Sequence, residues 1–76
     1  LAGRDKTQQP IDRLTARELE IFRLIGDGLT SSAIANRLHL STHTIDTHRE
    51  NIKRKLGVKS AAELNRQAVQ WSLEQN

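Results

Sequence analysis

The basic side chains of this chain are concentrated in residues 41–59, where they could bind a polyanion. Five cations stand there against two acids: Arg49, Lys53, Arg54, Lys55 and Lys59 against Asp46 and Glu50. The resulting net charge of +3 equals the net charge of the whole chain, whose pI is about 10.0. Positive charge gathered in one segment is typical of surfaces that bind nucleic acid. The alternative is a charged helix that is only solvated.

The residues that could support catalysis or metal binding form no recognisable site. His39, His43 and His48 are the only histidines, no cysteine is present, and no third ligand stands beside His39 and His43 in the sequence. His48 lies at the edge of an apolar helical face, which suits a partly buried or phosphate-contacting side chain. No Gly-rich phosphate loop or nucleophile elbow occurs. We therefore expect no enzyme activity, no cofactor and no metal.

The length and composition predict one small all-α domain. The 76 residues contain no apolar run long enough to cross a bilayer, and a cytoplasmic setting fits. Residues 1–11 have almost no periodic apolar content and read as a flexible linker or arm, which suggests a fragment of a longer protein. We expect the folded domain over residues 12–76, as a compact four-helix bundle.

The first helix is expected over residues 16–27. Thr15 and Glu18 have the spacing of a capping box, in which each side chain accepts from the backbone N–H of the other residue. Apolar residues cover a broad arc of this helix, so it should form the centre of the core. Gly26 and Gly28 are expected to end it.

The next two helices have the spacing of a helix-turn-helix motif, over about residues 31–50. Thr30 can cap a short helix over residues 31–38, and Ser41 can cap a longer one that ends at Gly57. A link of only a few residues joins the two helices. Such a pair commonly places its second helix in the major groove of DNA.

The outward face of the helix that starts after Ser41 divides into two halves. With Ile45, Ile52 and Leu56 turned inward, the residues in position to read bases are His43, Asp46, Thr47 and Glu50. A carboxylate there can accept from the amino group of cytosine, and the Thr47 methyl can contact that of thymine. Phosphate contacts are expected from the helix N-termini and the cationic half: Ser31, Ser32, Thr42, Thr44, His48, Arg49, Lys53, Arg54 and Lys55.

A fourth helix, expected over residues 61–73, has two apolar stripes. Ser60 and Glu63 form a second capping box before it. The stripe of Leu64, Ala68 and Trp71 is expected to face the core, which leaves the other stripe exposed: Ala62, Val69 and Leu73. This exposed stripe is expected to contact a second copy of the chain, and scattered surface apolar residues are the alternative.

These features resemble the LuxR-type helix-turn-helix domain, in particular its NarL/FixJ response-regulator branch. The resemblance covers about residues 12–73 and rests on these positions: Leu14-Thr15-Ala16-Arg17-Glu18-Leu19, Gly28-Leu29-Thr30, Ile34-Ala35, Leu40-Ser41, Thr44-Ile45, His48, Ile52, Lys55-Leu56 and Val58. It implies the C-terminal effector of a bacterial transcription regulator, placed after a receiver or sensor domain. It also implies DNA reading by the third helix and dimerisation through the fourth.

The chain departs from many members of that family on the surface expected to meet DNA. Many members carry Lys at the position of Asp46, and often Lys-Glu where this chain has Ser32-Ala33. Members that continue into His-Arg, as His48-Arg49 does here, often have an acid at the position of Asp46. Base preference therefore has to be argued from the residues of this chain.

The partners expected are double-stranded DNA, a second copy of the chain and the upstream domain, with RNA polymerase as a further candidate. Two other functions fit the same helices. One is the promoter-reading module of a sigma factor, against which the capped fourth helix argues. The other is a protein-interaction module that keeps the fold without binding DNA.

Overall fold

The computed structural model describes residues 9–75, and over this range the chain forms helices and no strand. A short 3-10 helix is followed by four α-helices: η1 Pro10–Arg13, α2 Ala16–Gly26, α3 Ser31–Leu38, α4 Thr42–Leu56 and α5 Ala61–Gln75. The predicted all-α class and four-helix architecture are confirmed. Helix α5 continues two residues beyond the predicted end, which is the usual uncertainty at a helix terminus.

Side-chain caps begin the helices at the predicted residues. The N-cap hydroxyls of three helices accept from the backbone N–H three residues later: Thr15 from Glu18, Thr30 from Ala33 and Ser41 from Thr44. The box before α5 is only partly as predicted. Ser60 Oγ accepts from the Glu63 N–H at 3.1 Å, but the Glu63 carboxylate accepts from the N–H of Lys59 and not from that of Ser60.

Left-handed residues end α3 and α4 and produce the sharp reversals of the chain. His39 has φ 59° and Gly57 has φ 73°, and the residue after each donates back to the last helical turn. In the first reversal, the Leu40 N–H bonds to the Ala35 carbonyl at 2.9 Å. This pattern satisfies helix carbonyls that otherwise lack a donor. The reversal at His39 places α4 after α3 as a helix-turn-helix, as the sequence predicted.

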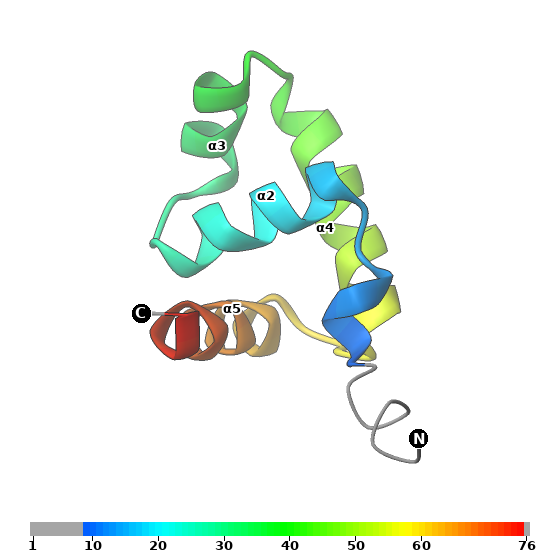
Figure 1. The fold of residues 1–76 in the computed structure, drawn as a ribbon. Coiled ribbons are helices and arrows are strands. Elements are labelled where there is room, and N and C mark those ends of the chain that lie inside the picture. Colours follow the sequence, from blue (N-terminus) through cyan, green and yellow to red (C-terminus); the bar gives the residue numbers. More distant parts are fainter. Residues whose placement is uncertain (1–8, 76) are drawn as a thin grey trace.

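Helix α2 lies between α3 and α5 and also contacts α4 (Figure 1). Its broad apolar face supplies the centre of the core, as expected, with Ile21, Phe22, Leu24 and Ile25 all buried. The other helices each add buried residues to the same cluster: Ile34, Ala35, Ile45, Ile52, Leu64 and Ala68. Each large side chain among them contributes about 1.5–3 kcal/mol by leaving water.

The inward face of α5 is the one predicted from its two apolar stripes. Leu64 and Ala68 are fully buried, and Trp71 is partly buried beside Phe22, with ring centroids 5.6 Å apart and planes tilted by 50°. This tilted arrangement is favourable for aromatic pairs. The docking of α5 on α2 therefore determines which stripe of α5 remains in solvent.

Ordered structure extends two residues before the predicted domain boundary at residue 12. Pro10 occupies the first turn of η1, where its missing N–H costs nothing, and Ile11 packs against the core. Contacts between η1 and α4 explain why this turn forms. The remainder of the predicted arm, residues 1–8, lies outside the described residues.

Gly26 is the last residue of α2. The close packing of α5 against this position requires a glycine there more than the end of α2 does. A Cβ atom at this position would lie 2.5 Å from the Ala68 carbonyl oxygen and 3.2 Å from Ser72 Cβ. The nearer atom belongs to the backbone of α5, so it cannot move without shifting that helix. Gly28, with φ 93°, is the glycine whose backbone conformation ends the helix.

We predict that Gly26→Ala destabilises the domain, although alanine favours helix formation by about 1 kcal/mol over glycine. The added methyl group should push α2 away from α5. The lost packing should outweigh the gain in helix propensity and lower the free energy of unfolding by about 1–3 kcal/mol. Urea unfolding followed by circular dichroism measures the change. The control is Gln67→Ala on exposed α5 surface, and an unchanged or higher midpoint for Gly26→Ala would contradict the close contact.

Candidate nucleic-acid interface

The packing of α4 turns one of its faces outward. Ile45 and Ile52 are fully buried against the core, and Leu56 is partly buried at the end of the same face. The four residues predicted to read bases are all exposed, three of them in the N-terminal half of the helix and Glu50 just past its midpoint: His43, Asp46, Thr47 and Glu50. The structure therefore brings the complete predicted reading set onto one open surface.

Hydrogen bonds within α4 restrict what this surface can offer. The Thr47 hydroxyl donates to the His43 carbonyl at 3.1 Å, so the hydroxyl hydrogen is already used. The Glu50 carboxylate accepts from Lys53 Nζ at 3.0 Å but is 69% exposed and keeps free acceptor capacity. Asp46 forms no ion pair with any described residue. The reading surface thus offers mainly carboxylate acceptors.

The N-termini of α3 and α4 provide the predicted anion-binding backbone groups. Ser31 is partly buried and Ser32 is exposed at the start of α3, and Thr42 is exposed at the start of α4. Within the described range, the N–H groups of these three residues have no acceptor. Thr44 is half-buried, and its hydroxyl lies 2.8 Å from the Ser41 hydroxyl in the cap of α4. Free N–H groups and the helix dipole both favour an anion at these ends.

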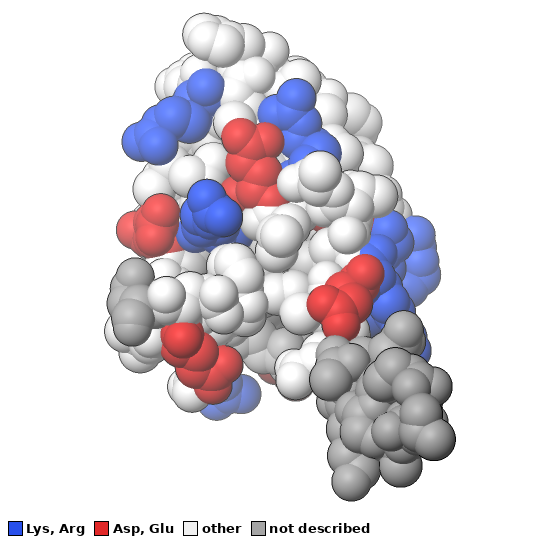
Figure 2. Space-filling model, viewed as in Figure 1, with Lys and Arg blue, Asp and Glu red and all other residues white. Residues whose placement is uncertain are grey.

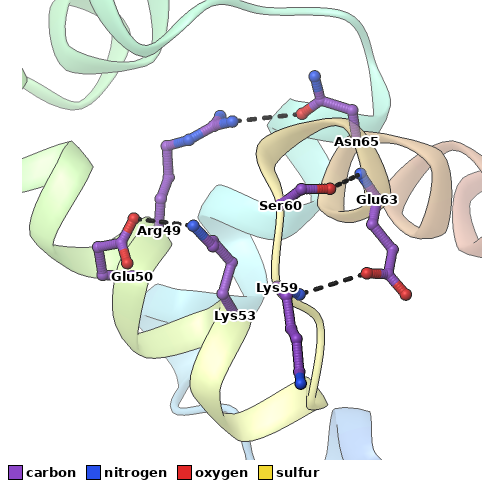
Figure 3. Close-up of polar contacts among 7 residues, drawn as sticks. All are labelled: Arg49, Glu50, Lys53, Lys59, Ser60, Glu63 and Asn65. Atoms are coloured by element: carbon purple, nitrogen blue, oxygen red, sulfur yellow. Dashed lines mark hydrogen bonds and ion pairs between the residues drawn. The ribbon is translucent and has the colours of Figure 1, made fainter.

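The four cations of α4 have different partners. Two are paired with carboxylates and two with amide oxygens: Lys53 with Glu50, Lys55 with Glu18, Arg49 with Asn65 and Arg54 with Asn51. Figure 3 shows the Arg49 and Lys53 contacts together. On the face drawn in Figure 2, acidic and basic side chains are interspersed, and basic side chains gather at the edge where α4 lies. The cationic half of α4 is therefore partly neutralised by the protein itself.

Glu18 has a role that the sequence did not reveal. Only 4% of the residue is exposed, and its carboxylate accepts from Lys55 Nζ at 2.7 Å and from the Thr15 N–H at 2.9 Å. Burial raises the pKa of the Glu18 carboxyl, but the bonds from Lys55 and Thr15 outweigh burial and hold the pKa below its ordinary value. This ion pair fastens α4 to the start of α2.

The pairing with Glu18 makes Lys55 less available than predicted for a phosphate. The Lys55 side chain is 31% exposed, and its ammonium group would have to leave a buried carboxylate to reach DNA. The two residues are separated by 37 positions, so no local pattern could have indicated the pair. In the sequence, the capping box with Thr15 already gave Glu18 a role, so nothing indicated a second partner.

His48 is partly buried, as expected from its place at the edge of the apolar face. Its Nδ1 atom is buried without a hydrogen-bond partner among the described residues. An N–H at that atom would lack an acceptor, so the neutral ring is expected to carry its hydrogen on Nε2. A donor on Nε2 suits the predicted contact with a phosphate.

The second apolar stripe of α5 is exposed, as predicted. Val69 and Leu73 are 43% and 67% exposed, and they are the exposed large hydrophobic residues of the described chain. Ala62 is exposed near the start of the same helix. The stripe is available for contact with another molecule, and pairing with a second copy stays a prediction.

Residues 9–75 contain neither a metal-binding cluster nor a membrane-spanning helix. No group of three or more His, Cys, Asp or Glu side chains is placed to hold a metal ion. No helix in this range has the length and apolar character needed to span a bilayer.

Sequence comparisons connect this interface with bacterial regulators. Residues 12–68 match the family described as bacterial regulatory proteins, luxR family. Relatives include the uncharacterized response regulatory protein YgeK of Escherichia coli, 51% identical over 82% of this chain and 42% of its own length. The oxygen regulatory protein NreC of Staphylococcus aureus is 40% identical over 88% of this chain and 31% of its own length.

A third relative is also named as a regulatory protein. The transcriptional regulatory protein MctR of Rhizobium johnstonii is 38% identical over 86% of this chain and 30% of its own length. The chain thus spans less than half the length of each of these relatives. No solved structure gives a significant match.

We predict that Glu18→Gln lowers the free energy of unfolding by about 1.5–3 kcal/mol at neutral pH, because Gln keeps an oxygen that can cap Thr15 but removes the negative charge that pairs with Lys55. A carboxyl whose pKa is depressed by folding stabilises the fold above its unfolded pKa and loses that contribution as the pH falls through its folded pKa. The difference from the unaltered chain should therefore shrink below about pH 4.3.

Urea unfolding measured between pH 7 and pH 3 checks this prediction. Glu20→Gln removes the same charge from the exposed side of α2, where the Arg17 pair is 3.5 Å long, and should change stability by less than about 0.5 kcal/mol. A Glu18→Gln effect that is independent of pH would show that the ion pair does not stabilise the fold.

Proposed function

Because the chain belongs to the luxR family of bacterial regulatory proteins, whose helix-turn-helix domains serve DNA-binding transcription regulators, we propose that it binds specific sequences in duplex DNA. In this proposal α4 enters the major groove and two copies of the chain bind two half-sites. The half-sites lie about one helical turn apart, as is usual for dimers with this motif. No catalytic step is assigned to the chain.

The observation that carries this proposal is the exposed face of α4 within a helix-turn-helix. The reading residues extend from the start of α4, next to α3, to just past its midpoint, and the first part of such a helix is where this motif meets base edges. The groups assigned to the phosphates on either side lie at the helix starts and along α4: Ser31, Ser32, Thr42, Thr44, His48, Arg49, Lys53 and Arg54. These backbone contacts would supply affinity and its dependence on salt.

The acids on the reading face determine which bases the domain prefers. A carboxylate at Glu50 or Asp46 accepts from the N4 amino group of cytosine and is repelled by O6 and N7 of guanine. The Thr47 hydroxyl is used within α4, so its methyl group is the part available for the methyl of thymine. The proposed half-site therefore has cytosine and thymine on the strand that faces α4.

The names of the relatives suggest the protein context. YgeK is named as a response regulatory protein, and an upstream receiver domain is proposed for this chain. Regulators of this kind act on DNA in the cytoplasm, and that location is proposed here. The exposed stripe of Ala62, Val69 and Leu73 on α5 is the proposed contact between two copies.

Selection of bound sequences from a random duplex pool tests the function and the base preference together. The unaltered chain should enrich two half-sites with cytosine at one fixed position in each. Glu50→Gln should shift that position towards adenine, because an amide both donates and accepts and so matches adenine N7 and N6. The expected change in relative affinity is about 5- to 150-fold, which corresponds to about 1–3 kcal/mol.

The control for this shift is Arg54→Gln, which removes a charge from an exposed residue outside the reading set. It should weaken binding to all sequences alike without changing the preferred base. An unaltered base preference in Glu50→Gln would exclude Glu50 from the reading set. Failure to enrich any sequence would refute sequence-specific binding itself.

We predict that Val69→Asp prevents two copies from binding adjacent half-sites, because it puts a charge into the apolar contact. Val69 is 43% exposed in the single chain, so the fold should survive. Affinity for DNA with two half-sites should fall at least about tenfold more than affinity for one half-site. Titration of both duplexes measures this. Gln67→Asp adds the same charge outside the stripe, and equal loss in both variants would argue against the interface.

A further inference from the structure

The cations of α4 fall into two classes according to what neutralises them. Lys53 and Lys55 are each bound to a carboxylate, so each pair carries no net charge. Arg49 and Arg54 are bound to the side-chain oxygens of Asn65 and Asn51, which are neutral. An amide acceptor fixes the position of a guanidinium group but leaves its full positive charge available to a further anion.

The contact between Arg49 and Asn65 is the one of these two that joins different helices. Arg49 Nη2 donates to Asn65 Oδ1 at 3.3 Å, and Figure 3 shows the Arg49 side chain extending from α4 towards α5. Asn51 and Arg54, by contrast, are neighbours on α4. A substitution at residue 65 therefore changes the position of Arg49 without altering α4 itself.

The Arg49 and Asn65 side chains also line the same surface groove. It has a volume of about 400 Å³ between α5 and the start of α3, and its lining includes Thr30, Ser31, Arg49, Asn65 and Val69. Ser31 belongs to the residues assigned to phosphate, and Val69 to the proposed contact between copies. The arginine is thus held where the DNA-facing surface and the exposed stripe of α5 meet.

We infer that Asn65 is a positioning residue for DNA binding, which holds the charged Arg49 guanidinium ready to bind a backbone phosphate. The inference rests on the proposed function and adds to it a residue of α5 that no sequence pattern assigned to DNA. Asn65 acts through Arg49 and does not touch the bases, so its effect is the same on every DNA sequence.

The choice of asparagine is central to this inference. An aspartate at residue 65 would hold Arg49 at least as firmly, but the resulting ion pair would have no net charge, as in the pair of Lys53 and Glu50. An alanine would leave the charge in place and release the long side chain, whose rotamers would then have to be ordered on binding. The two substitutions therefore weaken binding in different ways.

Titration of a duplex at several salt concentrations separates these effects in the 76-residue chain. Asn65→Ala should lower affinity about 3- to 10-fold, as expected for loss of one hydrogen bond, and leave the slope of log affinity against log salt unchanged. Asn65→Asp should reduce the magnitude of that slope by about 0.9, the value for one phosphate contact, as should Arg49→Gln. Asn65→Ala should have less than about a twofold effect when combined with Arg49→Gln.

Matched controls make the outcome decisive. Gln67→Asp adds the same charge to an exposed position of α5 that does not line the groove, and it should leave the slope nearly unchanged. Circular dichroism checks that every variant is folded, which is expected because Asn65 is exposed.

Equal effects of Asn65→Ala with and without Arg49 would overturn the inference, as would equal salt slopes for Asn65→Asp and Asn65→Ala. In either case the unaltered chain would still bind DNA with a steep dependence on salt, so the proposed function would stand. If the unaltered chain bound no duplex at low salt, the inference and the proposed function would both fail.

Discussion

Helix α2 carries a buried face so broad that α3, α4 and α5 all pack on it, and the position of every proposed contact surface follows from this packing. Ile45 and Ile52 of α4 are drawn into the core on one side, and Leu64 and Ala68 of α5 on the other. The backbones of α2 and α5 approach so closely at Gly26 that no space remains there for a side chain. Because each helix has only one inward face, the outward faces of α4 and α5 are determined at the same time.

Less of the positive charge of α4 is available to another molecule than its composition suggests. A count of charges shows a basic segment, but Glu18 and Glu50 each neutralise a lysine, and Asp46 adds negative charge where bases are to be read. What remains available for phosphate is mainly arginine held by neutral amides. This separation of roles agrees with a protein in which backbone contacts give affinity and a few acceptors give base preference.

The ion pair of Glu18 and Lys55 contributes to geometry as well as stability. It joins the first turn of α2 to the last turn of α4, at the end of α4 opposite the reading residues. With Ile45 buried near one end and Lys55 fastened near the other, α4 is held at two points. A helix held in this way needs little further ordering when it contacts another molecule, which lowers the entropic cost of binding.

Local features were predictable from the sequence because their causes lie within four residues of one another. The caps at Thr15, Thr30 and Ser41, the stop at Gly57 and the inward faces of the helices follow from side-chain type and the period of 3.6 residues. The exposure of the four residues proposed to read bases was predictable for the same reason, once the apolar face of α4 was known. The terminal turn at η1 was missed because it depends on contacts with α4.

Tertiary structure alone decided the contacts that join distant residues. Glu18 meets Lys55 across 37 positions, Arg49 meets Asn65 across 16, and the backbone of Ala68 closes on Gly26, all as results of how the helices cross. A crossing depends on the combined shape of several faces, which no single segment encodes. The sequence by itself therefore determined the helices and their exposed chemistry, and only the packed core decided that Lys55 pairs with Glu18 and Arg49 with Asn65.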